Sequence, residues 1–370
     1  MKIPDIHEVR YKENKIRAYL VKNGYDAMII GRIDNFAWFT DGGNSKVILP
    51  SETGFALIVI TRLRRYLISQ VMDMTRIMEE ELEGIDFDEY IPLHWYEVSR
   101  EEKAMELVKG CRVISDIPVE GAECLPDEIY KLHYPLTSKE IAKLRWLGDK
   151  AEEIITEVAF EISPGMSEHE IEAMLMYRYA RENINCNVLL TGSDERIFKY
   201  RHPNPSSKRI DKYVLLAPVP SRWGLNAPLT RLIYFGDKIP LEIEEKYNAV
   251  CRIAAAAISM CVTGTKFSDI LAMQKKLYKE MGYENEWKNH YQGGVTGYRI
   301  VNASLCNDPE SIVQINEAYA WFITITGVKS EELSVNTGDA RELLTVTGKW
   351  PTKEYDFNNQ KLKLPEILKR

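Results

Sequence analysis

Residues 137–182 read TSKEIAKLRWLGDKAEEIITEVAFEISPGMSEHEIEAMLMYRYARE, and this stretch decides the fold. Two capping-box patterns, Thr137–Glu140 and Ser167–Glu170, each mark the start of a helix. Between them, Ser163-Pro164-Gly165 ends the first helix, because proline cannot continue a helix and glycine favours its end. The stretch therefore predicts a long helix, a glycine turn and a shorter helix.

The same plan recurs about a hundred residues later. A long helix is predicted over Glu242–Cys261, a stop at Thr263-Gly264 and a shorter helix over Ser268–Met281. Each helix pair leads into apolar runs on both sides of a glycine turn, as antiparallel hairpins have, over Tyr213–Phe235 and Tyr319–Val335. We therefore predict an α+β domain with an internal two-fold repeat, in which one sheet carries helices on its outside.

The first third of the chain alternates helical and strand patterns and predicts a separate α/β domain. The predicted helices are Glu8–Lys22, Met72–Leu82 and Glu101–Val108, and the predicted strands are Ala27–Ile30, Phe55–Ile60 and Tyr66–Ile68. A linker follows at Lys131–Leu136. The predicted boundaries are 1–133 for the first domain, 134–347 for the second and 348–370 for a C-terminal tail.

Composition narrows the class of protein. Hydrophobic residues make up 45% of the 370 residues and charged residues 28%, a globular balance with enough apolar material for two cores. The net charge of −7 opposes broad binding to nucleic acid or anionic membranes. No signal-peptide pattern opens the sequence, and the six cysteines contain no C-x-x-C pair, so we expect reduced thiols and a cytoplasmic location.

Three further stretches carry a family resemblance. They are Asp34–Thr40 followed by Gly42-Gly43, Ser138–Arg145, and Leu225–Phe235 with its Leu229-Thr230-Arg231. Together with the helix-pair repeat they resemble creatinase, prolidase, aminopeptidase P and methionine aminopeptidase, which form the pita-bread, or peptidase M24, family. The resemblance implies a creatinase-type N-terminal domain, in which Asp34–Thr40 is a strand-turn segment, and a pita-bread domain with hydrolase, Xaa-Pro peptidase-like chemistry.

Metal-dependent members of this family resemble one another in two aspartates, one histidine and two glutamates that hold two divalent ions and activate a water. Matched residue by residue, the aspartates fall at Ala217 and Pro228, the histidine at Gln292 and the first glutamate near Phe322. Glu331 matches the last glutamate. One carboxylate does not hold two ions, so we expect no metal and no other cofactor.

The resemblance to creatinase implies that a protein with this fold can break a C–N bond without metal, using a histidine as acid and base. The matching residue is His202, in the loop Lys199–Pro205. Imidazole titrates near neutral pH and can relay a proton. Glu331 is the second catalytic candidate. The alternative interpretations are an exposed loop histidine and, for Glu331 with Glu332, a solvated pair at a strand end.

Four residues are candidates for substrate binding. Arg201 in the loop, and either Arg231 or Arg222 on the first hairpin, offer a bidentate fork for a substrate carboxylate. The alternative for each arginine is a surface or structural ion pair, which is the commoner role. His290 and Gln292 precede paired glycines, where backbone can approach a ligand closely, or where a tight turn buries the amide.

Two functions follow from these residues. The first is metal-independent hydrolysis of a C–N bond in a small carboxylate-bearing substrate, with His202 as acid and base. The second is a catalytically inactive pita-bread protein that binds a peptide or another protein. Under either function we expect His202, Glu331 and Gln292 to line one cavity. The resemblance also implies a homodimer in which Asp34–Asn44 lies near the partner's cleft.

Overall fold

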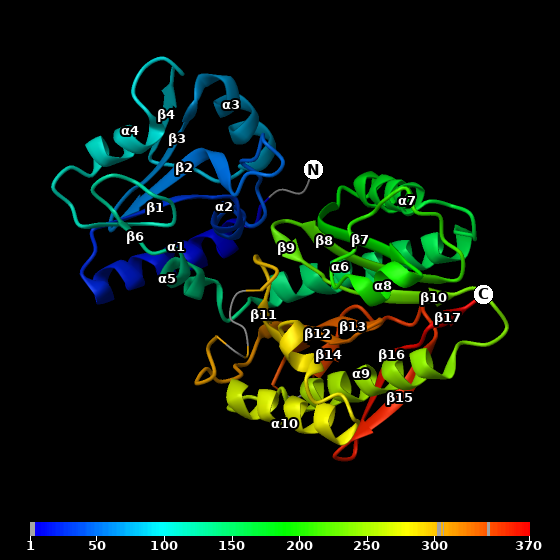
Figure 1. Cartoon of the computed structure of the whole chain (residues 1–370). Coiled ribbons are helices and arrows are strands. Elements are labelled where there is room, and N and C mark those ends of the chain that lie inside the picture. The colour runs from blue at the N-terminus through cyan, green and yellow to red at the C-terminus, as the bar shows by residue number, and fades with distance from the viewer. Residues whose placement is uncertain (1–3, 302–304, 306, 339–340) are drawn as a thin grey trace. The chain divides into compact units, whose positions relative to one another are not determined.

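The computed structural model describes residues 4–301, 305, 307–338 and 341–370 (Figure 1). It forms two compact units, Met1–Tyr134 and Pro135–Arg370. Among the described residues, no helix has both the length and the apolar character that a membrane span needs. The cysteines within this part of the chain, Cys111, Cys124, Cys186, Cys251 and Cys261, are free thiols, and Cys306 lies outside it.

The first unit is built on a six-stranded sheet with the order β4-β3-β2-β1-β5-β6. Strand β2 runs antiparallel to β1 and β3, and the other neighbours run parallel. The strands are β1 (Ala27–Arg32), β2 (Thr53–Thr61), β3 (Arg65–Gln70), β4 (Glu89–Leu93), β5 (Val113–Ser115) and β6 (Glu123–Cys124). The helices are α1 (Ile6–Asn23), α2 (Ile33–Phe39), α3 (Val71–Arg76), α4 (Arg100–Leu107) and α5 (Pro126–Tyr130), with a π-helical turn η1 (Ile77–Glu81) and a 3-10 turn η2 (Lys131–His133).

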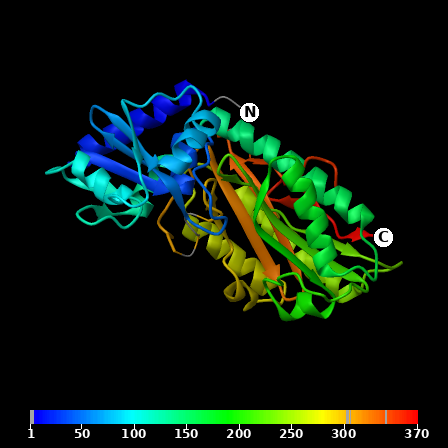
Figure 2. The ribbon, with the colours of Figure 1, turned by 90° about the horizontal axis from the view of Figure 1, so that it is seen from above.

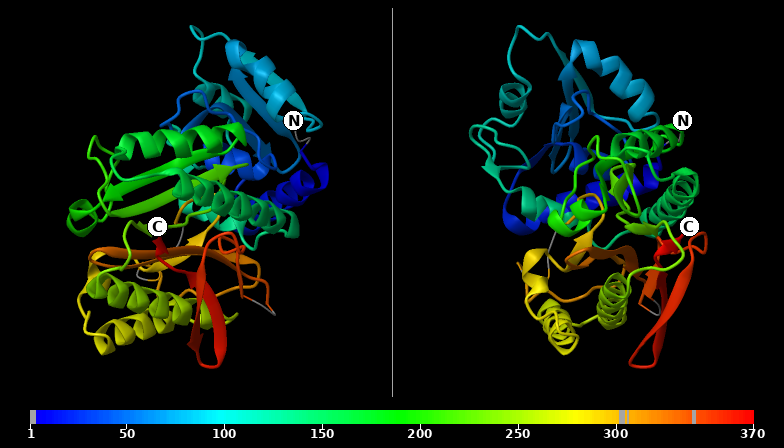
Figure 3. Two further views of the ribbon diagram at one scale, coloured as in Figure 1. Left: turned by 90° about the vertical axis from the view of Figure 1, so that its right-hand side faces the viewer. Right: turned by 45° about the vertical axis from the view of Figure 1, so that its right-hand side comes forward.

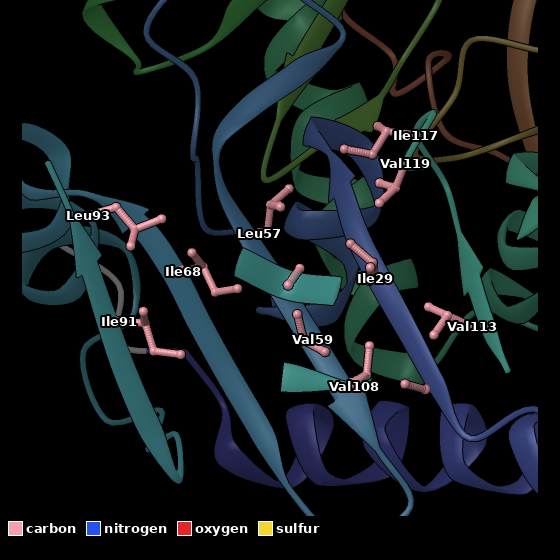
Figure 4. Close-up of a cluster of buried hydrophobic side chains, with 12 residues drawn as sticks. Ile29, Leu57, Val59, Ile68, Ile91, Leu93, Val108, Val113, Ile117 and Val119 are labelled. Atoms are coloured by element: carbon pink, nitrogen blue, oxygen red, sulfur yellow. The ribbon is translucent and has the colours of Figure 1, made fainter. Parts of the chain in front are cut away.

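Period-two alternation builds one core of this unit. Ile29 on β1, Leu57 and Val59 on β2, and Ile68 on β3 point to the same face of the sheet, where they meet Val108 beside helix α4 (Figure 4). The branched side chains suit a pleated surface, and each of these residues is at most 2% exposed.

Residues 34–39 are helical and Thr40 is the C-cap of this helix, which corrects the predicted strand and turn. They belong to helix α2, and the side chain of Asp34 accepts a hydrogen bond from the backbone N–H of Asn35. The aromatic rings of this helix are buried inside the unit, so packing overrides their strand preference. In the whole Asp34–Asn44 segment only Gly42 and Asn44 are not buried.

The second unit consists of two similar halves. The first half contains α6 (Ser138–Glu161), α7 (Glu168–Arg181), β7 (Asn185–Ser193), α8 (Glu195–Lys199), β8 (Tyr213–Arg222), β9 (Leu225–Asn226) and β10 (Arg231–Tyr234). The second half contains α9 (Leu241–Met260), α10 (Phe267–Glu280), the 3-10 turn η3 (Glu286–Asn289), β11 (Gly293–Thr296), β12 (Glu317–Ile325), β13 (Val328–Asn336) and β14 (Arg341–Leu343). Helix α7 packs on β7, and helix α9 packs on β12 and β13, so the strands lie inside and the helices outside (Figure 3).

Backbone hydrogen bonds at matching places demonstrate the internal repeat. After the first long helix, Gly165 N–H donates to the Ile210 carbonyl at 2.9 Å, and after the second, Gly264 N–H donates to the Val313 carbonyl at 2.8 Å. Both glycines have a φ of +92°, a conformation that L side chains rarely adopt. Both predicted capping boxes, at Thr137 and Ser167, are present.

The halves carry separate sheets where one continuous sheet was predicted. The first sheet has the order β17-β10-β8-β7, with β9 on β8, and the second has the order β11-β12-β13-β14. Isolated backbone hydrogen bonds join them, from Thr230 N–H to the Glu331 carbonyl at 3.1 Å and from Asn226 N–H to the Gly297 carbonyl at 2.9 Å. The two long strands β12 and β13 run through the middle of this unit, and every residue in them is buried (Figure 2).

Residues 348–370, which were predicted to be a separate C-terminal tail, are part of the second unit. They form the hairpin β15 (Thr352–Phe357) and β16 (Gln360–Pro365) and the short strand β17 (Leu368–Lys369). Strand β17 pairs in parallel with β10, so the end of the chain completes the first sheet.

Candidate functional site

A cavity of about 260 Å³ opens between the two halves of the second unit. Strand alternation and register explain its lining, because Leu190 pairs with Ala217 and Phe322 pairs with Glu331 across neighbouring strands. Two loops close the remaining sides. The lining residues are Val188, Leu190, His202, Ala217, Val219, His290, Tyr291, Ile300, Phe322, Lys329 and Glu331.

A buried ion pair lies on the β13 wall of this cavity. The Lys329 Nζ atom is 2.7 Å from the Glu331 Oε2 atom, and the two side chains are only 7% and 3% exposed. The Thr230 hydroxyl donates to the same carboxylate oxygen at 2.5 Å. Glu331 is therefore neutralised by a neighbouring cation and is not the solvated strand-end residue of the alternative interpretation.

Two imidazoles face each other at another wall. The Nε2 atoms of His202 and His290 are 3.1 Å apart, and the His290 Nδ1 atom is 2.8 Å from the Tyr291 carbonyl oxygen. A carbonyl only accepts hydrogen bonds, so His290 carries its proton on Nδ1, and its Nε2 accepts from the Nε2–H of His202. Within the part of the chain that the structure describes, the Nδ1 atom of neutral His202 has no hydrogen-bond partner, so its lone pair can accept a proton.

Both imidazoles are neutral near pH 7. Burial lowers the pKa of His290 to about 4, and the positive charge of Lys329 contributes in the same direction. His202 is exposed, as the alternative interpretation of this loop residue expected, yet it lines the cavity, and the partial burial of its ring, with help from Lys329, lowers its pKa. With Lys329 and Glu331 cancelling each other, the cavity lining carries no net charge.

Gln292 does not line the cavity, contrary to the prediction. Its side chain is fully buried, where its Nε2 donates to the carbonyls of Trp287 at 3.0 Å and His290 at 2.8 Å. Its Oε1 accepts from the Tyr278 hydroxyl at 3.0 Å. The amide thus holds the loop that carries His290, which is the buried-turn interpretation of this position.

The predicted arginines are also engaged elsewhere. Arg201 forms an ion pair with Glu286 and donates to the Thr326 hydroxyl at 2.9 Å. Arg222 lies over the rings of Trp146 and Trp223. Neither side chain lines the cavity, so neither supplies the carboxylate fork expected from the sequence.

Arg231 is completely buried on the opposite side of the strands. It forms ion pairs with Glu152 at 3.2 Å and with Glu332 at 2.8 Å. Glu331 and Glu332 are neighbours on β13, so their side chains point to opposite faces, one to the cavity and one to Arg231. A substrate does not reach Arg231 here, and we assign it a structural role.

Lys329 is a charged cavity residue that was not predicted from the sequence. It lies two residues before Glu331, and alternation along a strand places both side chains on one face. Applied outward from Glu331, that rule identifies Lys329 from the sequence alone.

The residues present do not fit the two-metal centre that the resemblance implies. Ala217 and Phe322 have no donor atom, Pro228 is buried and Gln292 is committed to backbone partners. The ammonium of Lys329 already neutralises Glu331. Within the described part of the chain, no group of three or more His, Cys, Asp or Glu side chains is placed to hold a metal ion.

We therefore expect purified chain to carry no stoichiometric Mn, Zn, Co or Fe. Elemental analysis after removal of any affinity tag measures this directly, with bovine serum albumin in the same buffer as the background control. Two equivalents of one transition metal per chain would contradict the expectation.

The fold and cavity define a pita-bread protein, and comparisons with known proteins agree. The model of metallopeptidase family M24 matches residues 142–316. An uncharacterized peptidase of Staphylococcus aureus (strain MW2) is 21% identical over 313 residues, which cover 80% of this chain and 89% of that protein. These matches support the resemblance to the creatinase/prolidase family, peptidase family M24, and the family model itself covers nearly all of the first half of the second unit and part of its second half.

Solved structures show the same fold over both units. The Xaa-Pro dipeptidase from Bacillus anthracis has a TM-score of 0.73 at 16% identity and covers 98% of this chain and 100% of its own. The prolidase from Pyrococcus horikoshii OT3 has a TM-score of 0.74 at 18% identity, covering 91% of this chain and 98% of its own. The dipeptidase PepE from Mycobacterium ulcerans has a TM-score of 0.77 at 13% identity, covering 100% and 99%.

Proposed function

We propose that the chain is a metal-independent hydrolase that breaks an amide C–N bond in a small molecule, with His202 as acid and base. The observation that carries the proposal is the Nδ1 atom of His202, which has no hydrogen-bond partner among the described residues and belongs to an imidazole held by His290 in a cavity with Lys329 and Glu331. The match of residues 142–316 to a family of metallopeptidases supports the reaction class.

The proposed reaction uses water as its second reactant. The His202 Nδ1 atom takes a proton from water while the water oxygen bonds to the carbonyl carbon, and an N–H of Lys329 donates to the developing oxyanion. His202 then gives the proton to the departing nitrogen as the C–N bond breaks. The products are a carboxylic acid and an amine, and His202 returns to its neutral form.

A second candidate function, ligand binding without turnover, is favoured by the state of Glu331. The Oε2 atom of its carboxylate accepts from Thr230 and pairs with Lys329, so this atom is already engaged by the protein. The walls of the cavity are otherwise largely apolar, as in binding pockets generally.

One experiment separates the two functions. Chelator-treated full-length chain is screened by thermal shift against small amides and short peptides, and the ligands that stabilise it are assayed for amine release. We expect release from at least one of them, at the same rate with and without chelator. Stabilisation without any release would favour the binding function, and release that requires added Mn or Zn would contradict metal independence.

A further inference from the structure

The ion pair in the cavity has unused hydrogen-bonding capacity. Thr230 and Lys329 both lie on the Oε2 atom of Glu331, and within the described residues no hydrogen bond is formed to its Oε1 atom. An ammonium has three N–H donors, and the carboxylate accounts for one of those of Lys329. A donor and an acceptor are therefore available side by side on one wall.

The electrostatics of the cavity select against ionised ligands. One positive and one negative side chain cancel, and the remaining polar residues in the lining are two neutral imidazoles and Tyr291. A net anion or cation that enters loses its hydration without gaining an unpaired opposite charge. A neutral ligand with a strong local dipole avoids this cost.

An amide group has the matching arrangement. Its carbonyl oxygen and its N–H lie side by side. The free N–H of Lys329 and the free oxygen of Glu331 are also close to each other, because the paired Nζ and Oε2 atoms of these side chains are 2.7 Å apart. We propose that the cavity recognises the primary amide or ureido end of a net-neutral small molecule, with its carbonyl on Lys329 and its N–H on Glu331. The hydrocarbon part of the ligand then packs against Val188, Leu190 and Phe322.

This inference rests on the proposed function and names its substrate class. The cavity volume of about 260 Å³ restricts the ligand to a small molecule. The apolar walls favour a ligand whose hydrocarbon part is branched aliphatic or aromatic. The ion pair selects the polar end group of the ligand.

The test is calorimetric titration of the full chain with three ligands that share one body: 4-methylpentanamide, 4-methylpentanoate and 3-methylbutylammonium. Wild-type chain is expected to bind the amide at least about tenfold more tightly than either ion. Equal binding of the three ligands, tighter binding of an ion, or no binding of the amide at millimolar concentration would each overturn the proposal.

Charge variants make the test specific to the ion pair. Lys329→Met leaves Glu331 unpaired and is expected to shift preference to the ammonium, whereas Glu331→Gln leaves Lys329 unpaired and is expected to shift it to the carboxylate, each by at least about tenfold. Lys150→Met is the matched control, because this lysine forms a surface pair with Glu153 and should change nothing. If both variants keep the wild-type preference, the ion pair does not select the ligand.

The result also separates this inference from the proposed function. Selective binding of the primary amide without release of ammonia would keep the ligand class and reject the hydrolase. Release of ammonia or of an amine from ligands that the three-ligand series shows to be bound without regard to charge would keep the hydrolase and reject the ligand class.

Discussion

Replacement of His202 by glutamine is expected to lower the rate of amide hydrolysis by a factor of about 10²–10⁴, the usual contribution of a general acid or base. Glutamine retains an N–H donor toward His290 but has no titratable nitrogen. Ligand affinity should therefore stay close to that of the wild type. The measurement is kcat and KM for amine release, with affinity from calorimetry.

The pH profile provides an independent reading of the same role. Burial and Lys329 lower the pKa of His202 from 6.5, so the neutral base predominates at pH 7. We expect kcat/KM to be flat above about pH 6.5 and to fall in acid as His202 takes up a proton. The acid limb should be absent from the residual activity of His202→Gln.

His169 supplies the matched control for this variant. It is 58% exposed on helix α7, pairs with Glu172 and does not line the cavity. His169→Gln should leave rate and affinity unchanged. A His202→Gln variant with full activity, or one that loses affinity as much as rate, would contradict the acid and base role.

The sequence was sufficient for the helix pairs and hairpins because their signals are local. Capping boxes at Thr137 and Ser167 and glycine stops after each long helix lie within a few residues of the boundaries they set. Strand β7 was missed because Asn185–Ser193 mixes polar residues and glycine with its apolar residues. Its strand character comes from pairing with β8, a contact between distant segments that no local pattern reveals.

The site was harder to predict than the fold. The resemblance identified His202 and Glu331, which the structure brings into one cavity with His290. The direction of the Gln292 side chain could not be predicted from the sequence. It depends on where the loop places the backbone carbonyls of Trp287 and His290, to which the amide donates. Lys329 could have been predicted by strand alternation from Glu331. It was not, because the family resemblance concerns only the positions of the metal ligands, and Lys329 is not one of them.

The glutamate pair on β13 shows how one dipeptide serves two purposes. Glu331 faces the cavity, and Glu332 is 1% exposed on the other face beside Arg231. Burial raises the pKa of Glu332 to about 7, against the opposing effect of the Arg231 charge. The two halves of the unit are thus joined by a charge network directly beneath the candidate site.

Arg231→Met is expected to destabilise the second unit by about 3–5 kcal/mol, because it leaves the buried carboxylates of Glu152 and Glu332 without their cation. For a domain of this size the loss corresponds to a drop in melting temperature on the order of 10 °C. Unpaired buried carboxyls have a pKa above that of the unfolded chain, so the folded variant binds more protons. Its deficit relative to wild type should therefore be larger at pH 8 than at pH 5.

Circular dichroism melts at both pH values measure this effect, with Arg145→Met as the control. Arg145 forms an exposed bidentate pair with Glu342 and is 46% exposed, so its loss should cost less than about 1 kcal/mol. Adding Glu332→Gln to Arg231→Met removes one stranded charge and should recover part of the lost stability. An Arg231→Met chain as stable as Arg145→Met, with no dependence on pH, would show that the network does not stabilise the join between the halves.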